Sequence, residues 1–379
     1  MKLLVFEPAR GGHHLIFLRF FVEDLLAGGH AVHLAAETGA TPSDALTAAL
    51  GPLLPHCTWV PLDHGPGRLL HGGTLDALAR AQRKVGADRV FACCLDLFTS
   101  GLFRRLALGL PAPHVLHGRI TGLFVRPRVA DRRETKRQGK WKTAGFRRLH
   151  QSGWLDRFFV LDESLPGELA AGVRPGSAVP LPDPWTGDFS TGQAEARRAL
   201  GLPPDAFLYL HYGTSSPRKG LPVVVAATRR LAPGGGAALV AAGRILDRDG
   251  GAGAGLRELV AAGGAYLHDR YIEDAEEPLF FRACDAVVLA YQGHYGSSNV
   301  QSRAAAAGRP VVTSDEGLVG WRTRQHGLGL TFRSGSTEEL AAALARLRQE
   351  GTERYAPALR AYAARHSRES FRQVLLDHL

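Results

Sequence analysis

Short apolar runs alternate with helix-length segments along most of the chain, and this alternation restricts its fold more than any other feature. Strands are predicted at 2–6, 30–35, 90–95, 114–116 and 157–161, and then at 207–212, 237–242, 286–290 and 310–314. Helices are predicted at 15–27, 221–231, 276–284, 298–307, 337–349 and 356–379. Because strands that alternate with helices form parallel sheets covered by helices, the sequence predicts an α/β protein.

Three prolines lie between Val179 and Trp185, where the first alternation ends. Proline fixes φ and removes a backbone donor, so no strong helix or strand is expected there. We therefore predict a first domain at 1–178, a Pro-rich linker at 179–205, a second domain at 206–355 and a final helix at 356–379. Two doubly wound, Rossmann-like domains of this kind would face each other across a cleft lined by the loops that follow the strands.

Cysteine usage and the first residues indicate the cellular setting. The four cysteines, Cys57, Cys93, Cys94 and Cys284, show no CxxC spacing, so a zinc site is not indicated. Cys93 and Cys94 lie in an apolar run, which is typical of buried free thiols and favours a reducing, cytoplasmic setting. The start of the chain has too few apolar residues before Glu7 for a signal peptide, and no run of 18 apolar residues predicts a membrane-spanning helix.

The net charge of +10 is concentrated in one segment, because residues 126–148 carry ten Lys and Arg residues against Asp131 and Glu134. Such a patch attracts an anionic partner, although a solvated loop or helix face has the same composition. Nucleic acid is not expected, because only Trp141 and Phe146 interleave the charges. We predict an anionic partner for Arg126–Arg148: phosphate, an acidic polymer or a membrane surface, the last as peripheral contact at the inner membrane face.

The loop after the first predicted strand ends in two glycines and two histidines, Gly11, Gly12, His13 and His14. Glycine lets the backbone approach a ligand closely, and a histidine at a helix start can act as a general base or bind a hydroxyl. Asp96 and His117 also follow strands predicted in the first half and are candidates for the same cleft. The structural alternatives are a helix cap for Asp96 and for one of His13 and His14, and packed core positions for the other and for His117.

Two loops of the second half combine glycine, hydroxyl and basic residues. The first loop contains Gly213, Thr214, Arg218 and Lys219. The second contains Gly296, Ser297, Ser298 and Asn299, with Arg303 in the helix that follows. A lysine ammonium beside a helix N-terminus is typical of a phosphate site, and arginine can add a two-pronged contact. Together the loops predict a pyrophosphate pocket, although an exposed basic turn and a capped helix are the alternatives.

These segments together resemble the GT-B glycosyltransferases, in particular glycosyltransferase family 4. The resemblance covers nearly the whole chain and rests on Gly11–Leu15, on Arg218–Gly220, and above all on Ala286–Ala290 with Ala304–Gly317. The last two segments are similar to the family's donor-site helix and the G-x-P-V-V strand that follows it. The resemblance implies a nucleotide-sugar donor in the C-terminal half, an acceptor in the N-terminal half, and a final helix that crosses back to the first domain. It thereby implies that the basic segment Arg126–Arg148 would bind an anionic or lipid-linked acceptor.

The chain departs from the family pattern near the donor. Tyr295 and Arg303 stand where the family often carries two glutamates, and Thr214 stands where an arginine precedes the phosphate lysine. The chain is similar to a subgroup with a serine-rich loop in place of the glutamates, with Asn299 replacing a glycine. These departures put the donor sugar and its nucleotide in question.

The sequence therefore predicts a metal-independent glycosyltransferase without a cofactor, since the nucleotide sugar is a substrate and no DxD metal motif is present. Lys219, Arg218 and helix N–H groups would stabilise the leaving diphosphate. The candidates for a catalytic base are His13, His14 and His117.

Two other functions remain open from the sequence. A catalytically degenerate GT-B relative could act as a nucleotide-sugar-binding or regulatory module. A sugar-nucleotide epimerase of the same fold would need acidic residues, for which Asp96, Asp315 and Glu316 are the candidates.

Overall fold

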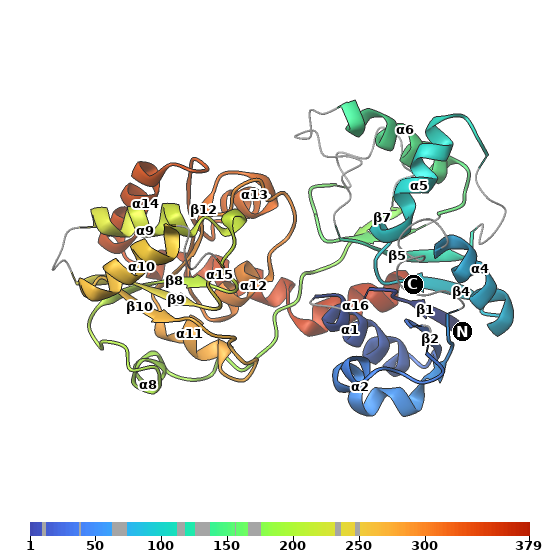
Figure 1. Cartoon of the computed structure of the whole chain (residues 1–379), viewed down its shortest axis with the longest axis horizontal. Helices are drawn as coiled ribbons and strands as arrows, with labels where there is room; N and C mark the ends of the chain where they lie inside the picture. Colours follow the sequence, from blue (N-terminus) through green and yellow to red (C-terminus); the bar gives the residue numbers. More distant parts are fainter. Residues whose placement is uncertain are drawn as a thin grey trace. The chain divides into compact units, whose positions relative to one another are not determined.

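The computed structural model describes residues 1–9, 13–37, 39–62, 74–111, 118–125, 137–155, 157–165, 176–231, 236–246 and 251–379. The chain divides into two compact units, each described below by itself (Figure 1). Unit 1 comprises Met1–Leu181 and Arg372–Leu379, and unit 2 comprises Pro182–Phe371. No helix within the described ranges has the length and apolar character needed to cross a membrane.

Unit 1 is built on a parallel sheet with strand order β3-β2-β1-β4-β5-β6-β7. Its strands are β1 (Lys2–Phe6), β2 (Ala31–Ala35), β3 (Thr58–Trp59), β4 (Arg89–Ala92), β5 (Ile120–Phe124), β6 (Phe158–Val160) and β7 (Ala178–Pro180). Its helices are α1 (His13–Ala27), α2 (Asp44–Leu50), the 3-10 helix η1 (Gly51–His56), α4 (Thr74–Val85), α5 (Asp96–Ala107) and α6 (Arg137–Gln151). Figure 1 shows α1 and α2 on one face of this sheet and α4 and α5 on the other.

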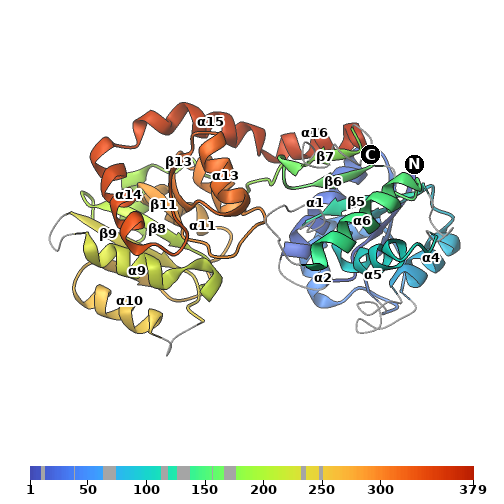
Figure 2. The same cartoon turned by 90° about the horizontal axis from the view of Figure 1, so that it is seen from above.

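Aromatic packing holds α5 and α6 on the sheet of unit 1. Phe146 of α6 makes edge-to-face contacts with Phe103, Phe124 and Phe158 at centroid distances of 5.5–5.9 Å. The two helices run side by side (Figure 2), and a Cβ atom on Gly145 would overlap the carbonyl of Phe103. Close helix contact therefore depends on a residue without a side chain at position 145.

The sequence did not predict β5, whereas the strand predicted at 114–116 lies outside the described residues. Gly122 interrupts the apolar pattern of β5, which hides the strand in the sequence. A Cβ atom at this position would overlap the carbonyl of Ala92 in the neighbouring strand β4. The same glycine that weakens the strand signal is thus the residue that lets β5 pair closely with β4.

Unit 2 contains a second parallel sheet, with strand order β10-β9-β8-β11-β12-β13. Its strands are β8 (Phe207–Tyr212), β9 (Ala237–Ala242), β10 (Ala265–His268), β11 (Ala286–Leu289), β12 (Val311–Ser314) and β13 (Gly329–Phe332). Its helices are α8 (Gln193–Ala199), η3 (Pro217–Lys219), α9 (Leu221–Arg230), α10 (Ala252–Ala261), α11 (Glu277–Ala283), α12 (Asn299–Ala306), α13 (Gly317–Gln325), α14 (Thr337–Glu350), η4 (Glu353–Tyr355) and α15 (Ala356–Arg365). The predicted strands at 207–212 and 237–242 coincide with β8 and β9, and the α/β class is confirmed in both units.

Two expectations about the junction segments were wrong. The Pro-rich stretch is not free of regular structure, because Val179 and Pro180 belong to β7. Pro180 is tolerated because β7 is an edge strand of its sheet, where a missing N–H costs little. The helix predicted at 356–379 is interrupted after Arg365, and α16 (Arg368–His378) begins where the Ser367 hydroxyl accepts the backbone N–H of Ser370.

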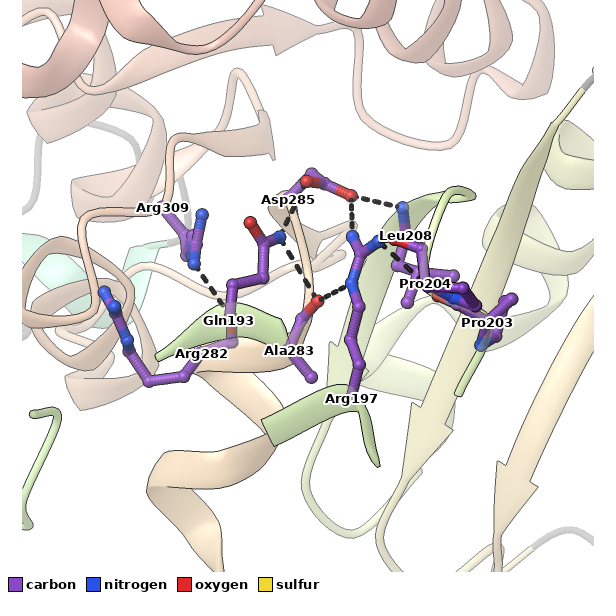
Figure 3. A network of polar contacts seen from close by, with 9 residues as sticks. All are labelled: Gln193, Arg197, Pro203, Pro204, Leu208, Arg282, Ala283, Asp285 and Arg309. Carbon is purple, nitrogen blue, oxygen red and sulfur yellow. Dashed lines mark hydrogen bonds and ion pairs between the residues drawn. The ribbon is translucent and has the colours of Figure 1, made fainter. Parts of the chain in front are cut away.

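A buried polar network at the amino ends of the strands fastens α8 to the sheet of unit 2 (Figure 3). Asp285 precedes β11 and accepts three hydrogen bonds, from Arg197 at 2.8 Å, the Leu208 backbone at 2.7 Å and Gln193 at 2.8 Å. Arg197 also donates to the carbonyl oxygens of Ala283 and Pro204. The network stabilises this edge because the buried guanidinium of Arg197 has the carboxylate of Asp285 and two carbonyl oxygens as partners.

Replacing Asp285 by alanine should lower the free energy of unfolding by about 3–5 kcal/mol, because Arg197 would stay buried and charged without its carboxylate. Glu258, which is exposed and lies 2.5 Å from Arg229, provides a matched control. Glu258→Ala should cost about 1 kcal/mol or less, as for other surface ion pairs. Urea unfolding of the three proteins measures both values. Equal losses for the two variants would show that the buried network does not stabilise unit 2.

Candidate functional site

The strand order of unit 2 reverses between β8 and β11. From β8 the chain adds β9 and β10 on one side of the sheet, and it then returns to place β11, β12 and β13 on the other side. Ligands of doubly wound sheets bind at the carboxyl end of the strands at this reversal. The loops after β8 and β11, where the sequence predicted the donor residues, are the two loops that start there.

The loop after β8 places a lysine ammonium over the end of that strand. Lys219 Nζ donates to the carbonyl oxygen of Tyr212 at 2.7 Å. Gly213 has a φ of +95°, and a Cβ atom on it would collide with Lys219 Nζ. The positive φ favours glycine at 213, and a side chain there would displace the Lys219 ammonium from its place over the strand end. Thr214, at the tip of the same loop, is exposed.

The two loops are joined to each other. The Gln292 backbone donates to the carbonyl oxygen of Arg218 at 2.8 Å. Gly220 has a φ of +69°, and a Cβ atom on it would overlap the carbonyl of Ala290 at the end of β11. The η3 turn and the start of the second loop therefore form one layer of backbone at the carboxyl end of the sheet.

The basic side chains of the first loop lie over the second loop. Arg218 Nη1 is 2.8 Å from His294 Nδ1, and its guanidinium lies 5.5 Å from the centre of the Tyr291 ring. Lys219 Nζ is 5.8 Å from the same ring centre. Two cations thus share one aromatic ring, an arrangement that concentrates positive charge at the switch point of the sheet.

The hydroxyls of Ser297 and Ser298 have different surroundings. Ser297 Oγ accepts a hydrogen bond from the fully buried Arg322 at 2.6 Å and donates to Asp183 Oδ2 at 2.5 Å. Ser298 occupies the N-cap position of α12 without a side-chain capping bond, and its Oγ is 3.2 Å from the Tyr291 hydroxyl. We therefore regard Ser297 as a residue that holds the loop in place. The hydroxyl of Ser298 is the better placed of the two to contact a bound molecule. Gly296, just before them, is half-buried.

Arg303, predicted as a donor residue, is paired with a carboxylate that the sequence analysis missed. Its Nε is 2.6 Å from Glu277 Oε1, and its Nη1 donates to Asn299 Oδ1 at 3.3 Å. The Tyr212 hydroxyl donates to Glu277 Oε2 at 2.6 Å. Burial raises the pKa of the Glu277 carboxyl, while Arg303 opposes that rise. Glu277 follows Glu276 at a helix start, so nothing in the sequence distinguished it from a solvated acid.

One more histidine lies beside this layer but is unsuited to proton transfer at neutral pH. His211 in β8 is buried, and neither of its ring nitrogens has a hydrogen-bond partner among the described residues. Burial, and then the charge of Lys219, lower its pKa to about 3. The ring is therefore neutral at physiological pH and cannot be a phosphate ligand through its charge.

The strand order of unit 1 reverses between β1 and β4, which brings Glu7 and Asp96 to the same edge of that sheet. Glu7 follows β1, and its Oε2 is 3.2 Å from His14 Nδ1. Asp96 begins α5, and its Oδ2 accepts the backbone N–H of Val125 at 2.7 Å. Asp96 is thus engaged in holding the end of β5.

The remaining candidates of the first half are Gly11, Gly12, His13, His117 and the basic segment. Gly11, Gly12 and His117 lie outside the described residues, and His13 begins α1 with its side chain undescribed. Of the basic segment, 126–136 also lies outside the described residues, whereas 137–148 belongs to α6.

Comparison with known proteins shows which family and which solved structures the chain is similar to. Residues 206–350 match the family described as Glycosyl transferases group 1. The D-inositol 3-phosphate glycosyltransferase of Thermomonospora curvata is 30% identical over 218 residues, which are 55% of this chain and 49% of that protein. The chain thus spans about half the length of the curated relative it matches.

Two solved structures illustrate the likeness of the fold. Sucrose-phosphate synthase from Thermosynechococcus elongatus aligns with 99% of this chain and 97% of its own, at a TM-score of 0.66 and 18% identity. Anabaena HepE in complex with UDP aligns with 100% of this chain and 99% of its own, at a TM-score of 0.71 and 14% identity. The chain has the GT-B fold of two Rossmann-like units, as predicted. The family match covers residues 206–350, the part of the chain that carries the loops after β8 and β11.

Proposed function

We propose that this chain is a glycosyltransferase that moves a sugar from a nucleoside-diphosphate sugar, bound by unit 2, to a hydroxyl of an anionic acceptor, bound by unit 1. The observation that carries the proposal is the joined pair of loops at the switch point of unit 2. These loops put Lys219 and Arg218 over Tyr291, beside the N-terminus of α12. The family match of residues 206–350 supports sugar transfer as the reaction.

The chemistry requires little beyond charge stabilisation. When the bond between the sugar and the diphosphate breaks, negative charge grows on the leaving phosphate oxygens. Lys219 and Arg218 would stabilise that charge, and the N–H groups at the positive end of α12 would add hydrogen bonds. We propose that transfer needs neither a metal ion nor a cofactor, since these groups already supply the positive charge.

Arg303 does not make the donor pocket inactive in this account. Its charge is balanced by Glu277, so the pair is held together within unit 2 and carries no net charge. Glu277 also accepts a hydrogen bond from the hydroxyl of Tyr212, the last residue of β8. A carboxylate therefore lies close to the loop that carries Lys219 and Arg218. Unit 2 therefore keeps both cations and an acidic group, which favours an active transferase over a degenerate nucleotide-binding module.

UDP is the first nucleotide to test, because the structurally similar HepE was solved with UDP. Thermal melting should rise with UDP, or with another of GDP, ADP and TDP, because a ligand of the native state stabilises it by mass action. Lys219→Ala should remove the rise, because the diphosphate loses its nearest ammonium group. Arg230→Ala, an exposed cation of α9, is the control and should leave the rise unchanged. Absence of a rise with all four nucleotides would contradict the donor assignment.

For the acceptor side, we propose that the paired helices α5 and α6 dock on an anionic bilayer. Leu108 and Leu110, just after α5, are 73% and 49% exposed. Exposed arginines surround this end of the helix pair: Arg104, Arg105, Arg147 and Arg148. Arg148 Nη1 also donates to the carbonyl of Leu106 at 2.6 Å, which fixes its charge at the end of α5. Exposed leucines among arginines are typical of an interfacial membrane contact.

Leu108→Asp should weaken co-sedimentation with vesicles of phosphatidylcholine and phosphatidylglycerol at least several-fold, because it replaces an inserting side chain by a charge that anionic lipid repels. Leu246→Asp offers a matched control, since Leu246 of unit 2 is 67% exposed. Wild-type protein should bind the anionic vesicles and not vesicles of phosphatidylcholine alone. Equal binding to both vesicles, binding to neither, or equal effects of the two substitutions would contradict the membrane proposal.

A further inference from the structure

His294, in the loop after β11, is a buried histidine with a polar neighbour at each ring nitrogen. It is 7% exposed, and its ring meets the Tyr291 ring edge to face at a centroid distance of 5.1 Å. Arg218 Nη1 lies 2.8 Å from its Nδ1, and the carbonyl oxygen of Ser297 lies 3.2 Å from its Nε2. The histidine thus connects a basic side chain of the loop after β8 to the backbone of the loop after β11.

The two neighbours determine which ring nitrogen carries the hydrogen. A guanidinium is a donor only, so the nitrogen that faces Arg218 must be the acceptor. A carbonyl oxygen is an acceptor only, so the nitrogen that faces Ser297 must be the donor. The contacts therefore require a neutral ring with its hydrogen on Nε2 and its lone pair on Nδ1. A doubly protonated ring could not accept the bond from Arg218 and would place a second positive charge against it.

The backbone around His294 is itself held in place. The Gly293 backbone donates to Glu316 Oε2 at 3.0 Å. A Cβ atom on Gly317 would overlap the carbonyl of His294, so the loop and the start of α13 are in close contact. The hydroxyl of Ser297 is bonded on two sides, as described above. Nδ1 of the histidine is therefore an acceptor at a fixed place.

Arg218, in contrast, is exposed, so it needs no partner to offset burial of its charge. Polar contacts of exposed charged side chains add little to stability. What this contact changes is the position of the guanidinium, because a free arginine samples many rotamers and loses that freedom when it binds a ligand. With one N–H on His294, the guanidinium stays over the Tyr291 ring, which Lys219 also approaches.

We propose that His294 is a positioning residue, which holds the guanidinium of Arg218 ready to bind the diphosphate of the donor. The inference rests on the proposed function and adds a residue to it. His294 accepts one N–H of Arg218 and does not touch the diphosphate, while other N–H groups of the same guanidinium bind phosphate oxygens. The arginine is thus ordered before the nucleotide sugar arrives, which lowers the cost of binding.

The ring form can be measured without nucleotide. In protein labelled with ¹⁵N at histidine, His294 should show the Nε2–H form at a pH where free histidine is neutral. His150 is an internal reference of the opposite form, because its Nδ1 lies 3.0 Å from the carbonyl oxygen of Leu155 and must be the donor there. Arg218→Ala should shift the Nδ1 signal of His294. An Nδ1–H form, a doubly protonated ring, or a signal unchanged in Arg218→Ala would overturn the inference.

Calorimetry with UDP, GDP, ADP and TDP tests what the contact does for binding. For a nucleotide that binds the wild type, Arg218→Ala should weaken affinity about 10-fold or more, because a hydrogen bond to a charged group is lost. His294→Phe keeps a ring against Tyr291 and should weaken affinity about 2–10-fold, because the arginine must then be ordered on binding. His294→Asn should lose less than His294→Phe, because its side-chain oxygen can accept near the place of Nδ1.

A double variant and a matched control complete the measurement. Arg218→Ala combined with His294→Phe should bind no more weakly than Arg218→Ala alone, because the histidine acts only through the arginine. His326→Phe is the control, since His326 Nδ1 lies 3.3 Å from Arg365 Nη1 and its ring meets the Trp321 ring edge to face. His326 comes before β13, at the opposite end of the sheet from the two loops, so this variant should bind as the wild type does.

The outcomes separate this inference from the proposed function. If none of the four nucleotides binds the wild type, the proposed function fails and the inference fails with it. If one binds, then equal affinity in His294→Phe, fully additive losses in the double variant, or no gain in His294→Asn over His294→Phe would each overturn the inference alone. If His294→Phe does not fold, the ring form and its response to Arg218→Ala still test the contact, since Arg218 is exposed.

Discussion

The pairing of β11 with β8 determines where the chemistry of unit 2 can lie. Because the chain adds two strands on one side of β8 and then returns to the other side, two loops leave adjacent strands at the same edge. Gly220 allows them to meet, since any side chain there would overlap the Ala290 carbonyl. Lys219, Arg218 and the start of α12 gather at one place because of this backbone contact, and the donor proposal depends on it.

Much of the polar chemistry around this layer holds the loops rather than facing a ligand. Ser297 is held between Arg322 and Asp183, and the Asp183 backbone N–H in turn donates to His366 Nδ1 at 3.1 Å. Arg303 is held by Glu277. Such paired groups fix the positions of loops because breaking any one pair would leave a buried polar group unsatisfied. The cations over Tyr291 lie beside this framework, where a diphosphate could reach them.

The sequence predicted the parallel α/β class and most of the strands of unit 2, because apolar runs bounded by glycine and proline are strong local signals. It missed β5, because Gly122, which allows close contact with β4, weakens the apolar pattern of the strand. It also missed the end of α15 and the start of α16, where Ser367 accepts the backbone N–H of Ser370. The sequence also predicted that Lys219 and Ser298 lie in loops at the end of the sheet, because each comes shortly after a predicted strand. Glu277 and Arg322 could not be found in this way, because their roles arise from pairing with residues distant in sequence.

The central claim is that the carboxyl edge between β8 and β11 binds a nucleoside diphosphate through Lys219 and the start of α12. A crystal structure of the protein with UDP tests it most directly. The account predicts phosphate oxygens within hydrogen-bond distance, about 2.7–3.2 Å, of Lys219 Nζ and of backbone N–H groups at the start of α12. A diphosphate bound elsewhere in unit 2, with Lys219 still directed only at the Tyr212 carbonyl, would contradict it.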